Sequence, residues 1–455
     1  MMEKIIKFEV DGLYNRFDYT INLSSGDESG LAILAAPNGY GKTTILKMID
    51  SFAKGDFIIF FKEHYKAVRF FITNGVQIEI IKKKKEDGDY SLIVSDGKNT
   101  SEFDDPLGDN GFVHTVNLFE KYIPYLRRIG PKRWRDDRAG DIINFQQALS
   151  RYKSHPALRK VWRKKEGWIE KVISSITIFT ISTNRLSRDD DNSVNEESDS
   201  QLMVKSIAGN IKDKIRGAIR DQFEEGRKKE TNFPARIMNA LATKNYPDKE
   251  SVLMSIKKLQ ELEEDYSRLG LIPNTETTSQ FNTHIQGQSA NGAGLLVLKT
   301  YLDDVIEKFS LLDDLAKKLD IFSSSINSLL SFKSIKTTID EGFVVEITDG
   351  EDMPVELESL SSGEQHLLVL IGKLVFETTD ECMVLIDEPE ISFHPEWQEA
   401  FISILTKIRK MNGFDVVLAT HSPILIGDDY WDYVVELAEQ YVKPDEIKFS
   451  NVDSL

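Results

Sequence analysis

The chain has 455 residues, 40% of them hydrophobic and 29% charged, with a formal net charge of -17 at pH 7. This length predicts two or three core-forming units, and the composition is typical of a globular protein in water. No apolar run approaches the roughly 18 residues of a membrane helix, and the acidic balance excludes a surface that binds nucleic acid everywhere, although a local basic patch is compatible with it.

The N-terminal residues alternate between apolar and polar side chains and lack the basic, apolar and small-residue regions of a signal peptide. We therefore expect no export and a cytoplasmic location. The following sequence, up to about residue 110, predicts short strands. They span residues 5–10, 31–34, 68–72, 76–81 and 90–94, and one helix that starts at Gly41 interrupts them.

A phosphate-binding pattern joins the strand at residues 31–35 to this helix. It reads Ala36-Pro37-Asn38-Gly39-Tyr40-Gly41-Lys42-Thr43-Thr44, with Ala36 in place of the first glycine of G-x-x-x-x-G-K-[ST]. A triphosphate needs converging backbone N–H groups, a helix N-terminus, a lysine on the β- and γ-phosphates and a hydroxyl on Mg²⁺. We expect ATP to be bound by Asn38, Gly39, Gly41, Lys42, Thr43 and Thr44, with Lys42 also catalytic and Thr43 a ligand of Mg²⁺.

Residues 115–171 are predicted to be helical and are strongly basic. Residues 121–171 hold fifteen Lys and Arg against five Asp and Glu. The densest part consists of Arg127, Arg128, Lys132, Arg133, Arg135 and Arg138, with Trp134 among them. Such a patch can bind DNA, but a charge run can equally be a solvated face. The β-branched run 172–181 then predicts a buried strand.

Residues 187–200 are too acidic and polar to pack a core and are predicted to be a linker. Apolar residues then recur every three or four positions in residues 204–223 and 252–269, which predicts two helices. They form either a short antiparallel coiled-coil hairpin or part of an ordinary helical subdomain. Residues 280–294 read as a loop, followed by helical sequence to residue 330 and strands near residues 335–339 and 343–347.

Two further motifs lie in the C-terminal part. The apolar run Met383-Val384-Leu385-Ile386 ends in Asp387 and Glu388, which predicts a strand with two carboxylates at its end. We expect Asp387 to bind Mg²⁺ and Glu388 to be the base that activates water. Leu360-Ser361-Ser362-Gly363-Glu364-Gln365 opens an apolar helix whose N-terminus can bind an anion. The single cysteine, Cys382, is predicted to be a buried core thiol.

These motifs carry a resemblance to ABC, SMC and Rad50-type ATPases. The segment 360–364 looks like their signature, 387–389 like their Walker B, 390–394 like their D-loop, and Ala419-Thr420-His421-Ser422 like their switch histidine. The resemblance implies an α/β fold, a bipartite ABC-type P-loop ATPase head interrupted by a helical, short coiled-coil insertion. It also implies that ATP joins a homodimer, with Ser361 and Gly363 contacting ATP in trans and His421 sensing the γ-phosphate as a catalytic residue.

The expected domains are an ATPase lobe at residues 1–186, an insertion at 187–300 and a second ATPase lobe at 301–455. No glutamine matches the family's Q-loop, and Asn184 is the candidate for that place as a ligand of Mg²⁺. His366 and His394 are predicted to be structural, because histidines beside apolar residues seldom bind phosphate.

The chain further resembles the compact ATPase subunits of bacterial anti-phage systems such as Septu and PARIS. That resemblance implies a slow regulatory ATPase that forms a homodimer or a higher homo-oligomer and controls a separate effector nuclease. The alternative is a DNA-binding repair or chromosome-maintenance ATPase like Rad50 or RecF, which the basic patch from Arg127 to Arg138 would serve.

Overall fold

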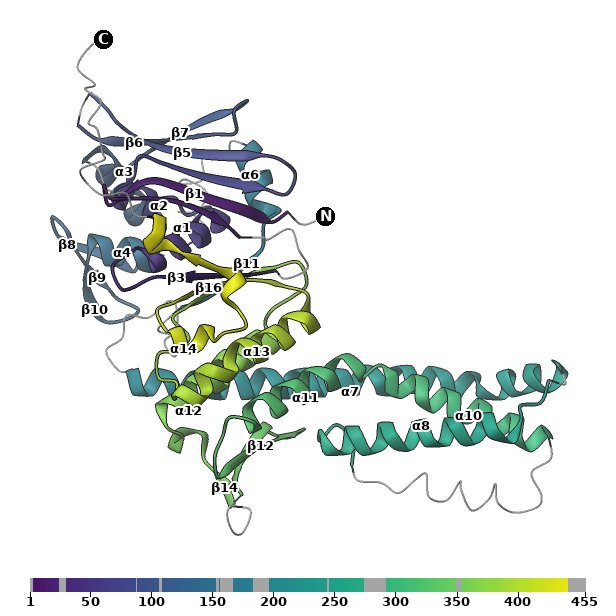
Figure 1. Cartoon of the computed structure of the whole chain (residues 1–455). Helices are drawn as coiled ribbons and strands as arrows, with labels where there is room; N and C mark the ends of the chain where they lie inside the picture. The colour runs from purple at the N-terminus through teal and green to yellow at the C-terminus, as the bar shows by residue number, and fades with distance from the viewer. Residues whose placement is uncertain are drawn as a thin grey trace. The chain divides into compact units, whose positions relative to one another are not determined.

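The computed structural model in Figure 1 describes residues 3–23, 30–86, 88–105, 109–152, 155, 167–182, 196–243, 245–273, 292–348 and 353–440. Contacts divide the chain into two compact units, one formed by Met1–Val194 with Thr378–Leu455 and the other by Asn195–Glu377. The first unit is therefore built from both ends of the chain. This α/β head with a helical insertion is the predicted fold class. Within the described ranges, no helix has the length and apolar character needed to cross a membrane.

A parallel sheet forms the centre of the first unit. Its strands have the order β11 (Ile178–Ile181), β15 (Met383–Asp387), β16 (Asp415–Thr420), β3 (Leu31–Ala35) and β17 (Val434–Glu436), and every neighbouring pair is parallel. The continuous apolar runs of β3, β15 and β16 are almost wholly buried, which is typical of a parallel sheet covered on both faces. Helix α13 (Pro395–Asn412) follows β15, and α14 (Pro423–Ile426) follows β16.

An antiparallel sheet forms a second layer of this unit. It has the order β2 (Phe17–Asn22), β1 (Ile5–Leu13), β4 (Ala67–Ile72), β5 (Gln77–Lys84), β6 (Tyr90–Ser95) and β7 (Thr100–Asp104). Helix α1 (Lys42–Lys54) shares one apolar core with both sheets, and α2 (Ile58–Lys62) packs beside it. Phe52 of α1 stacks on Phe70 of β4 with ring centroids 4.0 Å apart. The predicted early strands and the helix that follows the phosphate loop are thus confirmed.

The basic segment differs from its helical prediction. Between α3 (Asp109–Tyr122) and α4 (Phe145–Tyr152) the chain forms a three-stranded antiparallel sheet of β8 (Leu126–Gly130), β9 (Arg133–Asp136) and β10 (Asp141–Asn144). The reason is a period of two in β9, where Trp134 and Asp136 are buried while Arg133 and Arg135 are exposed. The many Arg and Lys residues had favoured a helix only through their intrinsic propensity.

Two other boundaries also differ. Residues 172–174 end helix α6 (Gly167–Ser174), and only residues 178–181 of the predicted strand pair in the sheet. Trp168, Ile169, Val172 and Ile173 are spaced to form one helical face, and they pack on the core shared by α1 and both sheets. Cys382 lies buried beside β15, as predicted, and burial raises the pKa of its thiol.

The second unit begins with the long helix α7 (Glu196–Thr243), followed by α8 (Lys249–Arg268), α10 (Gly292–Ser310) and α11 (Asp313–Asn327). The predicted linker is therefore wrong over residues 196–200, which lie in α7, and the predicted loop is wrong over residues 292–294, which open α10; residues 187–195 and 280–291 lie outside the described ones. The helices pair differently from the hairpin, which was one of the two arrangements that the sequence left open. The apolar seam of α8 packs on α10, which in turn contacts α7.

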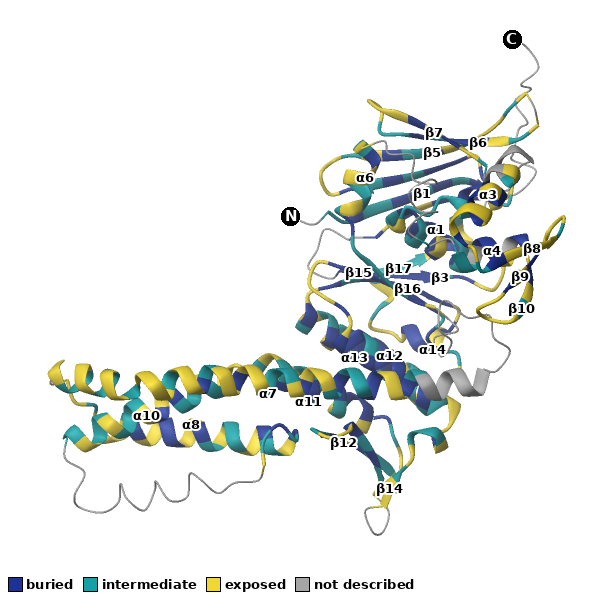
Figure 2. Cartoon of the chain, turned by 180° about the vertical axis from the view of Figure 1, so that it is seen from behind, coloured by how far each residue is buried: buried dark blue, intermediate teal, exposed yellow. Residues whose placement is uncertain are grey.

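The remainder of this unit carries the serine-glycine turn. Strands β12 (Lys333–Thr338), β13 (Gly342–Ile347) and β14 (Met353–Val355) form an antiparallel sheet before α12 (Ser362–Phe376). Helix α12 is buried along most of its length (Figure 2). It lies so close to α7 that a Cβ on Gly372 would approach Ile207 to within 2.6 Å, so a larger residue there would force Ile207 to shift.

Candidate active site

The parallel sheet brings three distant motifs to one edge. In register, Asp387 of β15 faces Ala419 of β16, and Ala419 in turn faces Leu34 of β3. The carboxyl ends of neighbouring parallel strands therefore lie together, where ligands of open α/β sheets usually bind. The loop after β3, the carboxylates after β15 and the histidine after β16 all start from this edge.

The phosphate loop has the backbone that an anion site needs. Gly39 and Gly41 adopt φ values of 90° and 86°, which side-chain-bearing residues rarely adopt. Ala36 is not among the described residues that have a positive φ. An alanine in place of the first glycine therefore introduces no backbone strain of this kind. No side chain caps the N-terminus of α1 and its first turn has no acidic residue, so the helix offers its N–H groups to a phosphate.

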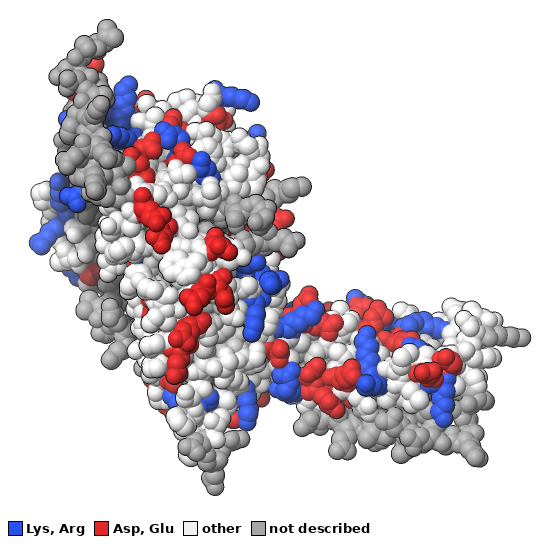
Figure 3. Space-filling view, viewed as in Figure 1, with Lys and Arg blue, Asp and Glu red and all other residues white. Residues whose placement is uncertain are grey.

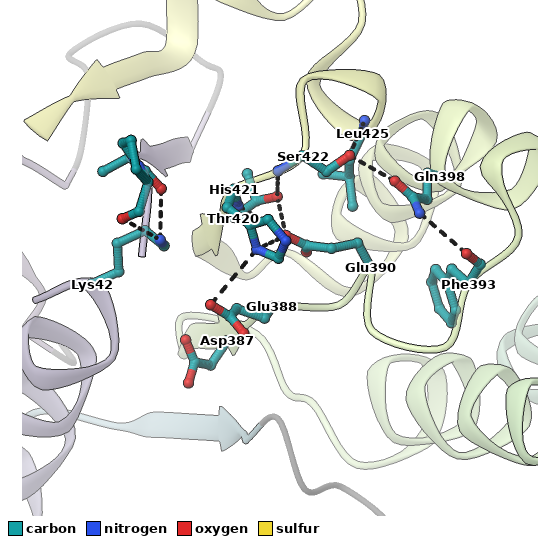
Figure 4. A network of polar contacts seen from close by, with 12 residues as sticks. Lys42, Asp387, Glu388, Glu390, Phe393, Gln398, Thr420, His421, Ser422 and Leu425 are labelled. Atoms are coloured by element: carbon teal, nitrogen blue, oxygen red, sulfur yellow. Dashed lines mark hydrogen bonds and ion pairs between the residues drawn. The ribbon is translucent and has the colours of Figure 1, made fainter. Parts of the chain in front are cut away.

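Lys42 lies buried, with 4% of its surface exposed. Its Nζ donates to the carbonyl oxygens of Ala36 and Pro37 at 2.6 and 3.2 Å, so the side chain lies back against its own loop (Figure 4). Burial lowers the pKa of this amine, while the carboxylates of Glu388, Glu390 and Asp387 oppose that shift. A phosphate chain in the loop would satisfy the same amine in place of the two carbonyls.

Thr43 and Asp387 form a pair of oxygen ligands. The Thr43 hydroxyl donates to both carboxylate oxygens of Asp387, at 3.1 and 3.0 Å. Two adjacent ligands of an octahedral Mg²⁺, each at about 2.1 Å, are separated by about 3 Å, and Mg²⁺ prefers one or two protein oxygens together with substrate phosphates. These two side chains therefore fit Mg²⁺, which, when bound with ATP, would neutralise charge on the phosphates.

Glu388 has an unusual backbone at the end of β15. Its φ is 48°, in the left-handed region, and its N–H donates to the carbonyl of Ala419 at 2.9 Å. Such a conformation is uncommon for a residue with a side chain and is often found at functional sites. Its carboxylate, in a side chain only 20% exposed, lies 3.8 Å from Nδ1 of His421. The turn thus points the carboxylate toward the switch histidine.

Sequence reasoning missed the central role of Glu390. This residue is 6% exposed, and its Oε1 accepts hydrogen bonds from the Thr420 hydroxyl at 2.6 Å and the His421 N–H at 2.9 Å. The same oxygen lies 3.1 Å from Nδ1 of His421. Glu390 therefore holds both backbone and ring of the histidine (Figure 4). Its position two residues after Glu388 was the available signal, but nothing in the sequence showed that it points inward.

A second layer continues this network. The Ser422 hydroxyl donates to Gln398 of α13 at 2.6 Å, and the Gln398 amide donates to the carbonyl of Phe393 at 3.1 Å. Ser422 also caps α14 by accepting from the N–H of Leu425. The switch segment and the segment after Glu388 are thereby both hydrogen-bonded to Gln398 of α13.

Tyr14 was likewise missed. Its hydroxyl lies 2.7 Å from that of Thr44 in the phosphate loop, and its φ of 54° places it in a strained turn between β1 and β2. A Cβ on Gly41 would lie 3.0 Å from Leu13 and 3.5 Å from the Tyr14 ring. This turn therefore supports the loop from one side.

The remaining predicted residues lie elsewhere. Ser361 and Gly363 belong to the second unit, where Ser361 is the N-cap of α12 and forms a capping box with Glu364. Asn184 lies outside the described residues. His394 is exposed at the N-cap of α13, and His366 lies partly buried within α12.

The first unit thus combines a phosphate loop on a helix N-terminus, a lysine, two Mg²⁺-type oxygen ligands and a carboxylate beside a histidine. The pattern and its geometry define a P-loop nucleotide-binding ATPase. The family profile described as "AAA domain, putative AbiEii toxin, Type IV TA system" matches residues 37–427, from the phosphate loop to the segment after the switch histidine. The chain belongs to this family.

Other similarities are local or distant. Protein ea59 of Escherichia phage lambda is 34% identical over 69 residues, which make up 15% of this chain and 13% of ea59. The match thus spans only a small part of that curated relative. The Smc head domain of Pyrococcus furiosus with an extended coiled coil, bound to the C-terminal domain of ScpA, is 13% identical with a TM-score of 0.35, and the alignment covers 93% of this chain and 91% of that one. For the SMC head domain of Thermotoga maritima the identity is 11%, the TM-score 0.31, and the coverage 93% and 91%.

Proposed function

We propose that the chain is a slow regulatory ATPase in which two copies bind ATP between their heads. The observation that carries this proposal is the convergence of Lys42, Thr43, Asp387 and Glu388 at one edge of the parallel sheet. Glu388 would orient and deprotonate the attacking water, and His421, held by Glu390, would contact the γ-phosphate. Ser361 and Gly363 of the other copy would complete the phosphate site from the N-terminus of α12.

We further propose that the ATP state controls a separate effector nuclease in a bacterial anti-phage complex, as in the Septu and PARIS systems. Two observations support this. The switch segment and the segment after Glu388 share a hydrogen-bonded network with Gln398 of α13, which would carry a nucleotide-dependent change to that helix. The family's description also names a toxin of a type IV toxin–antitoxin system, which favours a role in restraining or releasing a toxic activity.

The test is co-purification with the product of the neighbouring gene, with Mg-ATP, with ADP and without nucleotide. We expect the two proteins to elute together and the complex to change with the nucleotide. A Lys42→Ala chain should lose the nucleotide dependence, whereas Lys47→Ala, on the exposed side of the same helix, should retain it. Two proteins that remain separate under all three conditions would contradict effector control.

A specific observation also favours a second candidate, binding of a nucleic-acid backbone by the basic sheet β8–β10. Arg127 and Arg135 pair with Asp137, at 2.7 and 3.7 Å. Three other cations, Lys132, Arg133 and Arg138, are exposed and form no ion pair with any described carboxylate. Cationic side chains project at the edge of the molecule where β8 is drawn (Figure 3).

The sheet is also rigidly supported. Asp136, only 1% exposed, accepts hydrogen bonds from Arg151, from Tyr152 and from the backbone N–H groups of Arg138 and Ala139. Arg151 in turn binds both carboxylate oxygens of Asp141, at 2.9 and 2.8 Å. The cationic side chains therefore extend from a backbone that is held in place, which reduces the entropy lost when they bind phosphates.

Replacing Lys132, Arg133 and Arg138 together by alanine should weaken duplex DNA binding and reduce the steepness of its salt dependence. The slope of log K against log salt should fall by about 2 to 3, since each phosphate contact contributes about 0.9. A control with alanine at Arg220, Lys228 and Lys257, which are exposed cations of α7 and α8, should leave the slope unchanged. If the affinity of the wild-type chain for DNA does not depend on salt, the basic side chains of this sheet are solvated and do not contact phosphates.

A further inference from the structure

Ser361, in the signature turn, is hydrogen-bonded to a carboxylate of its own helix, that of Glu364. Oε2 of Glu364 accepts hydrogen bonds from the backbone N–H of Ser361 at 2.8 Å and from its hydroxyl at 2.9 Å. The Ser361 oxygen also accepts from the N–H of Glu364 at 3.3 Å, which completes the capping box. The two donors of Ser361 that could hold a phosphate oxygen are therefore both engaged by Glu364.

Lys333 neutralises this carboxylate from a different element. Its Nζ lies 2.8 Å from Oε1 and 2.9 Å from Oε2 of Glu364, and the two side chains are only 25% and 13% exposed. Burial alone would raise the pKa of Glu364, but the hydrogen bonds from Lys333 and Ser361 hold that pKa below its usual range. Glu364 is thus an anion at the place where the helix N-terminus attracts anions.

The position of Lys333 is firmly set. It is the first residue of β12, and it follows Phe332, whose φ is 61° and whose carbonyl accepts from the N–H of Thr348 at 3.0 Å. The side chain of Asn327, at the end of α11, bonds both the N–H and the carbonyl of Ile335, at 2.6 and 3.1 Å. The start of β12 is therefore held from two sides, and the backbone that carries the Lys333 side chain is fixed in place.

We infer that Glu364 is a built-in competitor of the γ-phosphate for Ser361, and that Lys333 is the positioning residue that sets the strength of this competition. The inference rests on the proposed function, in which the signature turn of one copy meets ATP bound to the other. When the phosphate arrives, Ser361 turns its hydroxyl from Glu364 to the phosphate, and Glu364 keeps its two contacts with Lys333. Without Lys333, two anions would face each other with no cation between them.

The test is a double-mutant cycle on dimerisation of the full chain, measured by sedimentation velocity with Mg²⁺ and the β,γ-imido analogue of ATP. We expect Lys333→Met to weaken dimerisation by about tenfold, because one uncompensated charge beside a phosphate contributes on the order of a tenfold change at an intermediate effective dielectric constant. Glu364→Gln should strengthen dimerisation by about threefold. In the Glu364→Gln background, Lys333→Met should change it by less than about twofold, since contacting residues are coupled.

Two controls separate this effect from a loss of structure. Lys336→Met removes another cation of β12, one that pairs with Glu346 and is 53% exposed, and should leave dimerisation unchanged. Thermal unfolding should show that each variant is folded at the temperature of the assay. An equal effect of Lys333→Met with and without the glutamate, or none in either background, would overturn the inference while the proposed function stands. A wild-type chain that binds the analogue but remains monomeric would overturn both.

Discussion

Replacing Glu388 by Gln is expected to reduce the rate of ATP turnover by about 100- to 10,000-fold, the range that a general base contributes. The amide has the shape of the carboxylate, so the left-handed turn and its hydrogen bond to Ala419 can persist. Lys42, Thr43 and Asp387 are untouched, so nucleotide affinity should stay within a few-fold of the wild type. Because ATP is bound but not hydrolysed, the dimer should accumulate.

Steady-state phosphate release and sedimentation with Mg-ATP check the two parts of this prediction separately. Glu396→Gln is the matched control, because Glu396 is exposed in the first turn of α13 and should not affect either measurement. If the Glu388→Gln chain hydrolyses ATP at the wild-type rate, another group must activate the water, and the unusual backbone of Glu388 has a different purpose.

Replacing Lys42 by Ala should weaken ATP binding by about 10- to 150-fold, because hydrogen bonds to charged groups contribute about 1.5–3 kcal/mol. The lysine is buried against the carbonyls of Ala36 and Pro37, so its amine has little freedom to lose when it turns to the phosphates. Hydrolysis should fall with binding, since the same amine neutralises the β- and γ-phosphates.

Calorimetric titration with Mg-ATP measures the affinity, and Lys47→Ala on the exposed face of α1 controls for the loss of a positive charge. Loss of the amine also leaves the two carbonyls of the loop without their donor, so the free energy of unfolding should fall by about 1–3 kcal/mol. A Lys42→Ala chain that binds ATP as tightly as the wild type would show that the loop around it is not the phosphate site.

The chemistry of the phosphate loop could be predicted because it is local. Gly39, Gly41, Lys42 and Thr43 are consecutive or nearly so, and their backbone needs follow from residue type alone. The carboxylates at the end of the strand at residues 383–387 were similarly recognisable. In contrast, the basic sheet was predicted as helix, because the propensity of arginine and lysine outweighed the short period-two pattern around Trp134.

The sequence by itself determined the α/β class, the phosphate loop and the carboxylate pair, since each is encoded in a run of neighbouring residues. Only the tertiary structure decided that Thr43 and Asp387, 344 positions apart, share a hydrogen bond, that Glu390 turns inward to hold His421, and that Lys333 reaches Glu364. Strand register and burial set these contacts. Both depend on residues distant in the chain, so no local pattern contains them.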